Sequence, residues 1–133
     1  MKLTIFSDGG ARGNPGPAAA GVVIKNEAGK SMAAYGEYLG EQTNNFAEYS
    51  ALISGLKKAH ALGATEVDCF LDSELIVKQM KREYKVKEQT LQKLFMIAYN
   101  AATVFKKITY HHIRREKNKE ADKLVNETLD ARR

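Results

Sequence analysis

The sequence has almost no cysteine and no long apolar run, and both features narrow the class of protein. Cys69 is the only cysteine among 133 residues, so the chain cannot form an internal disulfide, and its place in the mostly apolar run Val67–Leu71 indicates a buried thiol. No uninterrupted apolar run approaches the roughly 18 residues that a membrane span needs. The N-terminal residues turn polar too early for a signal peptide. We therefore expect a cytoplasmic protein with no membrane partner.

Internal repeats, low-complexity segments and interdomain linkers are also missing. A chain of 133 residues, 44% hydrophobic and 28% charged, can bury one sizeable core. We expect a single domain over residues 1–133 that acts as a monomer.

The charge balance favours an anionic partner. Lys and Arg number 21 against 16 Asp and Glu, which gives a formal charge of +5. The excess is concentrated in Lys78–Lys87 and Arg114–Lys119. Nucleic acid is one candidate partner, and a solvated face is the ordinary alternative for such runs.

Hydrophobic periodicity divides the chain into strands and helices. The expected strands are Leu3–Asp8, Ala20–Lys25, Ser31–Leu39, Glu66–Asp72 and Ile108–Ile113. The expected helices are 45–62, 73–80 with Asp72 or Ser73 as its cap, 91–105 and 118–129.

Short signals set the ends of two of these elements. Gly9 and Gly10 are expected to end the first strand. Asn45 is expected to cap the first helix together with Glu48, three residues later, and Gly63 to end it.

The order of the elements predicts an α/β fold with a mixed five-stranded sheet flanked by helices. The first three strands follow one another through short turns, which favours an antiparallel meander. Helices precede the fourth and fifth strands, so both can run parallel to the first through right-handed crossovers.

Four acidic residues are placed where a site could form. Asp8 and Asp72 stand at the C-terminal ends of two predicted parallel strands, and neighbouring strands would bring them to one sheet edge. Glu48 and Asp122 each lie one turn before apolar residues of a helix and therefore border its core face.

Clustered carboxylates repel one another unless they share protons or hold a cation. An all-oxygen cluster suits Mg²⁺ or Mn²⁺ better than zinc, and two such ions could support phosphodiester cleavage. Each acid also has a structural alternative: a turn acid for Asp8, a helix cap for Asp72, a capping partner for Glu48 and an exposed partner of lysines for Asp122.

The sequence around these acids resembles type 1 ribonuclease H. The resemblance rests on four stretches in the family's order, Ser7–Pro17, Thr43–Glu48, Leu71–Ser73 and Asn118–Asp122, and covers essentially the whole chain. It implies the ribonuclease H-like fold and endonucleolytic hydrolysis of the RNA strand of RNA/DNA hybrids, leaving 3′-hydroxyl and 5′-phosphate ends. It also implies that two Mg²⁺ ions, which Mn²⁺ can replace, are bound by Asp8, Glu48, Asp72 and Asp122.

The resemblance further implies substrate contacts by Gly13, Asn14, Thr43, Asn44 and Asn45. A glycine-rich turn and small polar side chains can approach a sugar closely and sense its 2′-hydroxyl group. A plain turn is the alternative interpretation of the segment around Asn14.

The sequence departs from the family in the loop before Asp122, where many members carry a histidine. The three histidines here are His60, His111 and His112, and we expect His112 to lie within the last strand as a packed or edge residue. Arginines occupy the loop instead. Arginine cannot act as a general base but can bind phosphate.

A second departure is the absence of an extra basic helix, because only Met80–Thr90 connects the second and third helices. Tyr84 and nearby lysines offer a smaller surface that could contact the DNA strand, and a solvated connector is the alternative. This layout resembles the compact, archaeal-like members, some of which also cut double-stranded RNA.

Two other functions compete with a hybrid nuclease. A non-catalytic nucleic-acid-binding domain on the same fold is disfavoured because all four acids are present. Another nuclease of the superfamily, such as an exonuclease or resolvase, is disfavoured by the Thr43–Asn45 and Asn14–Pro17 stretches.

Overall fold

Five strands form one mixed sheet in the computed structural model, which describes residues 1–132. The strands are β1 (Lys2–Ala11), β2 (Gly16–Lys25), β3 (Ser31–Gln42), β4 (Glu66–Leu71) and β5 (Lys107–His112). Their order across the sheet is β3-β2-β1-β4-β5. β1, β2 and β3 are antiparallel neighbours, whereas β4 and β5 run parallel to β1. The predicted sheet and strand directions are confirmed.

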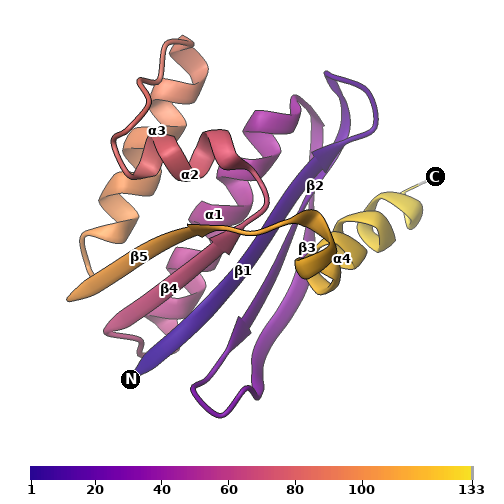
Figure 1. Cartoon of the computed structure of the whole chain (residues 1–133). Coiled ribbons are helices and arrows are strands. Elements are labelled where there is room, and N and C mark those ends of the chain that lie inside the picture. Colours follow the sequence, from indigo (N-terminus) through magenta and orange to yellow (C-terminus); the bar gives the residue numbers. More distant parts are fainter. Residues whose placement is uncertain (133) are drawn as a thin grey trace.

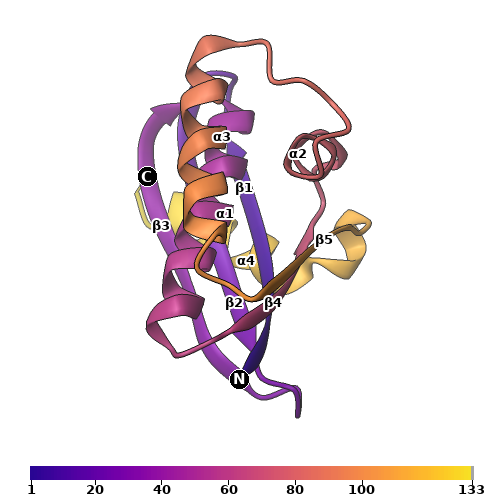
Figure 2. The same ribbon diagram turned by 90° about the vertical axis from the view of Figure 1, so that its left-hand side faces the viewer.

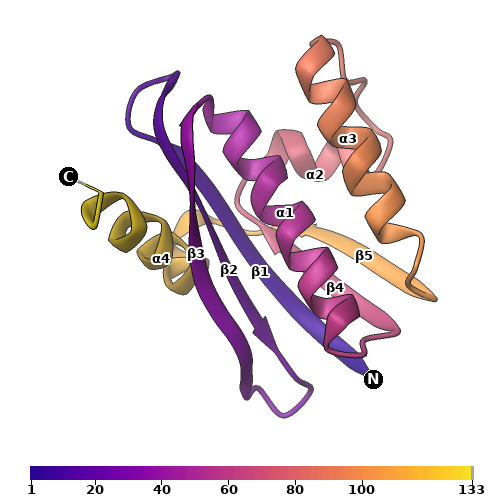
Figure 3. The ribbon, with the colours of Figure 1, turned by 180° about the vertical axis from the view of Figure 1, so that it is seen from behind.

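Helices cover both faces of this sheet. They are α1 (Asn44–Ala61), α2 (Glu74–Met80), α3 (Gln89–Ala102) and α4 (Lys119–Asp130), and a short 3-10 helix, η1 (Arg115–Lys117), precedes α4. α1 and α3 lie on one face and α4 on the other (Figures 1 and 3). In the view of Figure 2, α3 stands in front of α1, and the two helices are in contact. Within residues 1–132, each helix is too short or too polar to span a bilayer.

Each face of the sheet has its own apolar core. Alternate residues of β1, Leu3 and Ile5, are buried against α1. The buried Cys69 lies in this larger core, as the sequence predicted. A smaller core joins Val125 and Leu129 of α4 to Ala19 of β2. The last helix is therefore held to the sheet by few apolar side chains.

The prediction that Gly9 and Gly10 end the first strand is wrong. Both residues stay in the antiparallel ladder with β2, and β1 continues to Ala11. Glycines have no side chain to signal strand pairing, but they allow another element to approach the strand closely. Gly63 does end α1, with a left-handed φ of 96°.

The predicted cap of the first helix is also wrong. Thr43 rather than Asn45 is the N-cap, because its hydroxyl oxygen accepts the backbone N–H of Phe46 at 3.2 Å. Glu48 consequently takes no part in capping and is free for another role. Ser73, one of the two predicted candidates, caps α2.

Candidate active site

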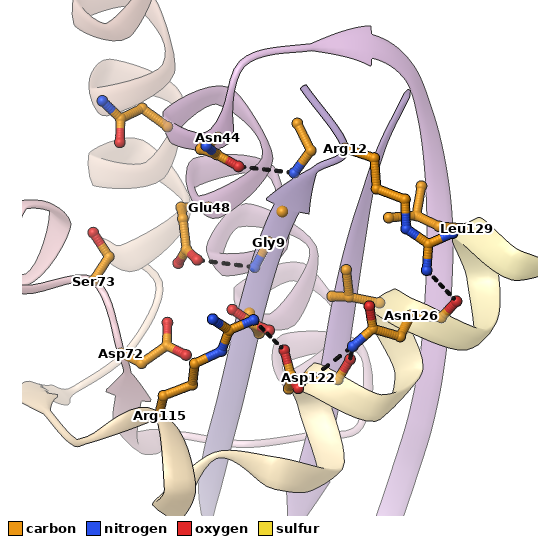
Figure 4. Close-up of a pocket in the computed structure, with 15 residues that line it drawn as sticks. Gly9, Arg12, Asn44, Glu48, Asp72, Ser73, Arg115, Asp122, Asn126 and Leu129 are labelled. Atoms are coloured by element: carbon orange, nitrogen blue, oxygen red, sulfur yellow. Dashed lines mark hydrogen bonds and ion pairs between the residues drawn. The ribbon is translucent and has the colours of Figure 1, made fainter. Parts of the chain in front are cut away.

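Three carboxylates meet at the C-terminal ends of β1 and β4. Asp8 lies near the end of β1, and Asp72 directly follows β4, its parallel neighbour. Glu48 reaches them from the first turns of α1 (Figure 4). One oxygen of each of the three side chains lies within 4.8 Å of the others. β1 and β4 are therefore adjacent, as the predicted site requires.

Glu48 is oriented by the sheet and keeps one oxygen unpaired. Its Oε1 accepts the backbone N–H of Gly9 at 3.1 Å. Its Oε2 is buried and has no hydrogen-bond partner among residues 1–132. A buried carboxylate oxygen without a donor is costly, and a bound cation would remove that cost. This donor set therefore fits a hard divalent cation.

The cluster raises the pKa of its members. Burial, followed by repulsion from Asp72, raises the pKa of Asp8 from 3.8 to about 7. Burial and the charges of Asp8 and Asp72 raise the pKa of Glu48 well above 4.5. Burial also raises the pKa of Asp72, against the opposing effects of Asp8 and the Arg115 cation. Metal-free, the cluster favours protons, so protons compete with cations for it.

Asp122 lines the same cavity but stands apart from the other three. It lies in the first turn of α4, and its charge contributes to the raised pKa of Asp8. Its Oδ1 is 3.3 Å from Nη2 of Arg115, and its Oδ2 accepts from Asn126 Nδ2 at 3.4 Å. All four predicted acids therefore border one cavity of about 580 Å³.

The predicted substrate residues mostly gather beside this cavity. Asn44 and Asn45 line it, and together with Asn14 and Thr43 they also line a second cavity of about 580 Å³. The amide oxygen of Asn14 accepts the Asn44 backbone N–H at 3.0 Å, which ties the two loops together. Gly13 lies in the same exposed turn, with φ 109°, but lines neither cavity.

Tyr84 lies outside both cavities on the connector between α2 and α3. Its side chain is 47% exposed. Lys78 Nζ lies 4.9 Å from its ring centroid and 3.3 Å from its hydroxyl oxygen. The two residues form one exposed basic and aromatic surface.

The three histidines lie away from the acids. His112 ends β5, as expected, and its Nδ1 is 3.8 Å from a Glu74 carboxylate oxygen. His60 makes an edge contact with Phe105, and His111 stacks on Phe70. Among residues 1–132, the lining of the acid cavity includes no histidine.

Sequence reasoning missed three residues that line the acid cavity. Asn126 follows Asp122 by one helical turn, a spacing that could have identified it. Arg12 reaches the C-terminal part of α4, where its Nη2 is 2.8 Å from Asp130 Oδ1, and no local pattern signals this pairing. Ser73 was predicted only as a helix cap.

The strand order and the acids at the ends of adjacent parallel strands define a ribonuclease H-like nuclease fold. A family model described as reverse transcriptase-like matches residues 6–128. Solved RNase H1 structures share 36% to 47% identity with nearly the whole chain. The chain belongs to the type 1 ribonuclease H family.

Three relatives define its place in the family. The bifunctional protein Rv2228c of Mycobacterium tuberculosis is 44% identical over 132 residues, 98% of this chain and 36% of that protein. Its N-terminal RNase H domain, solved as a fusion with maltose-binding protein, has a TM-score of 0.93 at 43% identity, covering 96% of this chain and 98% of that chain. RNase H1 of Halobacterium salinarum has a TM-score of 0.96 at 36% identity, covering 98% of this chain and 99% of that chain.

The third relative, LC11-RNase H1, was isolated from compost by a metagenomic approach and solved in complex with an RNA/DNA hybrid. That complex has a TM-score of 0.92 at 46% identity and covers 97% of each chain. Full-length relatives can be longer, since this chain spans 36% of Rv2228c and 65% of the Halobacterium ribonuclease HI.

Proposed function

We propose that this chain is an endonuclease that hydrolyses the RNA strand of RNA/DNA hybrids. The observation that carries the proposal is the group of three carboxylates within 4.8 Å, one of them with a buried unpaired oxygen, in a chain of the ribonuclease H family. Burying these carboxylates together costs free energy unless a cation is bound. The group therefore suits metal-dependent phosphodiester cleavage. The LC11 relative's complex with a hybrid supports this choice of substrate.

In this proposal two Mg²⁺ ions, which Mn²⁺ can replace, are held by Asp8, Glu48, Asp72 and Asp122. When bound, such ions supply an activated water and stabilise the charge that develops on the leaving oxygen. The hydrogen bond from Gly9 fixes one Glu48 oxygen and leaves the other to face the cluster. Cleavage on this pattern leaves 3′-hydroxyl and 5′-phosphate ends.

Arg115 is the cation nearest to Asp122 and belongs to the loop where the family often has histidine. Its guanidinium can bind a phosphate oxygen of the RNA strand, but it cannot take a proton from water. We assign it to phosphate binding rather than to proton transfer.

The same proposal places the hybrid across the neighbouring loops. Gly13, Asn14, Thr43, Asn44 and Asn45 contact the sugars and phosphates near the scissile bond, where small polar groups can sense the 2′-hydroxyl. Tyr84, with Lys78 beside it, contacts the DNA strand. Residues 1–133 act as one ribonuclease H domain, as a monomer in the cytoplasm.

The test is cleavage of an end-labelled RNA/DNA hybrid in Mg²⁺ and in Mn²⁺, with double-stranded RNA, single-stranded RNA and double-stranded DNA as parallel substrates. We expect hybrid cleavage that a chelator stops and that Asp8→Asn abolishes without unfolding the protein. Asp68→Asn is the matched control, because this acid lies on β4, the strand next to that of Asp8, but pairs with Lys2 at 3.2 Å, outside the cavity. Full activity in Asp8→Asn would refute the assignment. A wild type that binds hybrid without cutting it would instead indicate a non-catalytic binding domain.

A further inference from the structure

The residue opposite Asp8 in the sheet is a glycine. Gly21 of β2 is the antiparallel partner of Asp8. Directly opposed residues of an antiparallel pair project to the same face of the sheet, so a side chain at position 21 would stand beside the Asp8 carboxylate. Helix α4 covers that face, and its first turn lies over Gly21.

The contact between Gly21 and α4 leaves no room for a side chain. A Cβ atom at position 21 would come within 3.0 Å of the Ala121 carbonyl oxygen and lie 3.1 Å from Val125 Cγ2. The carbonyl is backbone, so no side-chain rotation can relieve the overlap. The first turn of α4 would have to move away from the sheet, and Asp122, the next residue after Ala121, would move with it.

Asn118 fastens the start of α4 to the strand that carries Asp8. Its side chain is 2% exposed, and its Nδ2 donates to the carbonyl oxygen of Ser7 at 2.9 Å. Its backbone carbonyl accepts the N–H of Asp122 at 3.1 Å. Although Asn118 is the N-cap of α4, its side chain makes no capping hydrogen bond. The side-chain amide therefore links α4 to β1 and does not cap the helix.

A related arrangement exists on the opposite face. A Cβ atom at Gly9 would come within 3.0 Å of the backbone of Ala47 and Glu48. The two helices that carry Glu48 and Asp122 thus approach the sheet from opposite faces, each over a glycine next to or across from Asp8.

We propose that Gly21 and Asn118 are positioning residues that hold Asp122 beside Asp8 for metal binding, an inference that rests on the proposed function. Gly21 permits the close approach of α4, and Asn118 holds its first turn there. Gly21 acts through Asp122. Asn118 acts through Asp122 and also through a side-chain hydrogen bond to Asp72.

The experiment measures the Mn²⁺ dissociation constant of metal-stripped protein by electron paramagnetic resonance, at a temperature where circular dichroism shows each variant folded. Gly21→Ala and Asn118→Ala are each expected to weaken Mn²⁺ binding roughly tenfold or more, the usual effect of losing a group that orients a metal ligand. In an Asp122→Asn background, Gly21→Ala should cause no further loss, because it acts through that carboxylate.

Gly36→Ala is the matched control. A Cβ atom at position 36 also conflicts with α4, at the side chain of Thr128 and at the backbone carbonyl oxygen of Leu124, which is 2.9 Å away. Both residues lie further along the helix than Ala121. We expect it to lower stability but to weaken Mn²⁺ binding much less than Gly21→Ala does, because its conflicts with α4 lie beyond the turn that carries Asp122. An equal loss of affinity in Gly36→Ala would overturn the inference, since any disturbance of α4 would then suffice.

The remaining outcomes separate this inference from the proposed function. If the wild type binds Mn²⁺ and cleaves hybrid while Gly21→Ala and Asn118→Ala bind Mn²⁺ as tightly, the positioning role is refuted and the nuclease assignment stands. If Gly21→Ala does not fold, Asn118→Ala is also measured in the Asp122→Asn background. A loss of affinity there as large as in the wild-type background would refute the positioning of Asp122, because it would then come from Asp72. A wild type that neither binds Mn²⁺ nor cleaves hybrid refutes both.

Discussion

Replacing Asp8 by asparagine should make the metal-free protein more stable at neutral and basic pH, although it destroys the proposed site. The pKa of Asp8 is raised in the folded protein from 3.8 to about 7 by burial and by Asp72. As the pH rises above 3.8, the unfolded chain loses this proton first, so the folded state binds more protons and its stability falls until the pH passes about 7. Asp8→Asn lacks this titrating carboxyl group, so it does not lose this stability as the pH rises.

The size of the effect follows from the pKa interval. Between pH 5 and 7 the carboxyl is mostly protonated in the folded state, reaching half ionisation near pH 7, and is ionised in the unfolded state. This difference costs the wild type up to about 1.4 kcal/mol per pH unit. The free energy of unfolding of Asp8→Asn, relative to wild type, should therefore increase by about 2 kcal/mol over this range. Comparing the two pH dependences cancels any constant cost of placing an amide at position 8.

The assay is urea unfolding in a chelator at several pH values, followed by circular dichroism, with equal m-values as the check that both proteins unfold alike. Added Mg²⁺ should stabilise the wild type at pH 8 and have much less effect on Asp8→Asn. Parallel pH profiles for the two proteins would refute the reasoning, because they would mean that Asp8 carries no raised pKa in the folded state.

Three further predictions concern residues around the acids. Arg115→Ala should slow hybrid cleavage roughly tenfold or more if its guanidinium binds phosphate. Its free energy of unfolding should change by less than about 0.5 kcal/mol, because the ion pair with Asp122 is exposed. Thr43→Ala should lower stability by about 1 kcal/mol through loss of the α1 cap and should raise KM for hybrid. Tyr49→Phe should lower stability by about 1–3 kcal/mol, because it leaves the buried Gln79 Oε1 without its 2.6 Å donor, with activity retained where the protein is folded.

Each of these has a control that isolates its cause. Arg115→Lys keeps the charge without the planar fork, so it should recover only part of the cleavage rate, and wild-type rates in Arg115→Ala would exclude the phosphate role. Thr43→Ser keeps a capping hydroxyl and should unfold like the wild type. A double variant Tyr49→Phe, Gln79→Leu removes both polar groups and should regain stability, and failure to do so would exclude an unpaired buried oxygen as the cause.

The sequence was sufficient for the sheet and for much of the site because both depend on short-range patterns. Asp8 lies near the end of one strand and Asp72 directly follows another, and the alternation of both strands is visible in the chain. Glu48 lies on an apolar helix face, so periodicity indicates the surroundings of all three. Thr43 was missed as a cap because Asn45 is an equally good capping type, and only the backbone conformation distinguishes them.

Other features could not be predicted because they depend on contacts between distant segments. Gly9 and Gly10 carry an ordinary turn signal, and only the ladder with β2 and the approach of α1 keep the strand extended there. The place of Asp122 depends on how α4 docks on β2 and β3, which no pattern within residues 118–130 encodes. Arg12 likewise finds its partner near the other end of the chain.

The wide separation of the acids along the chain also bears on synthesis at the ribosome. Asp8 lies in β1 and emerges well before Asp122, which belongs to α4. A growing chain that already contains the first three carboxylates lacks the fourth until α4 has been synthesised. The proposed nuclease therefore has a complete set of acids only after α4 has joined the sheet, whatever follows it in the chain.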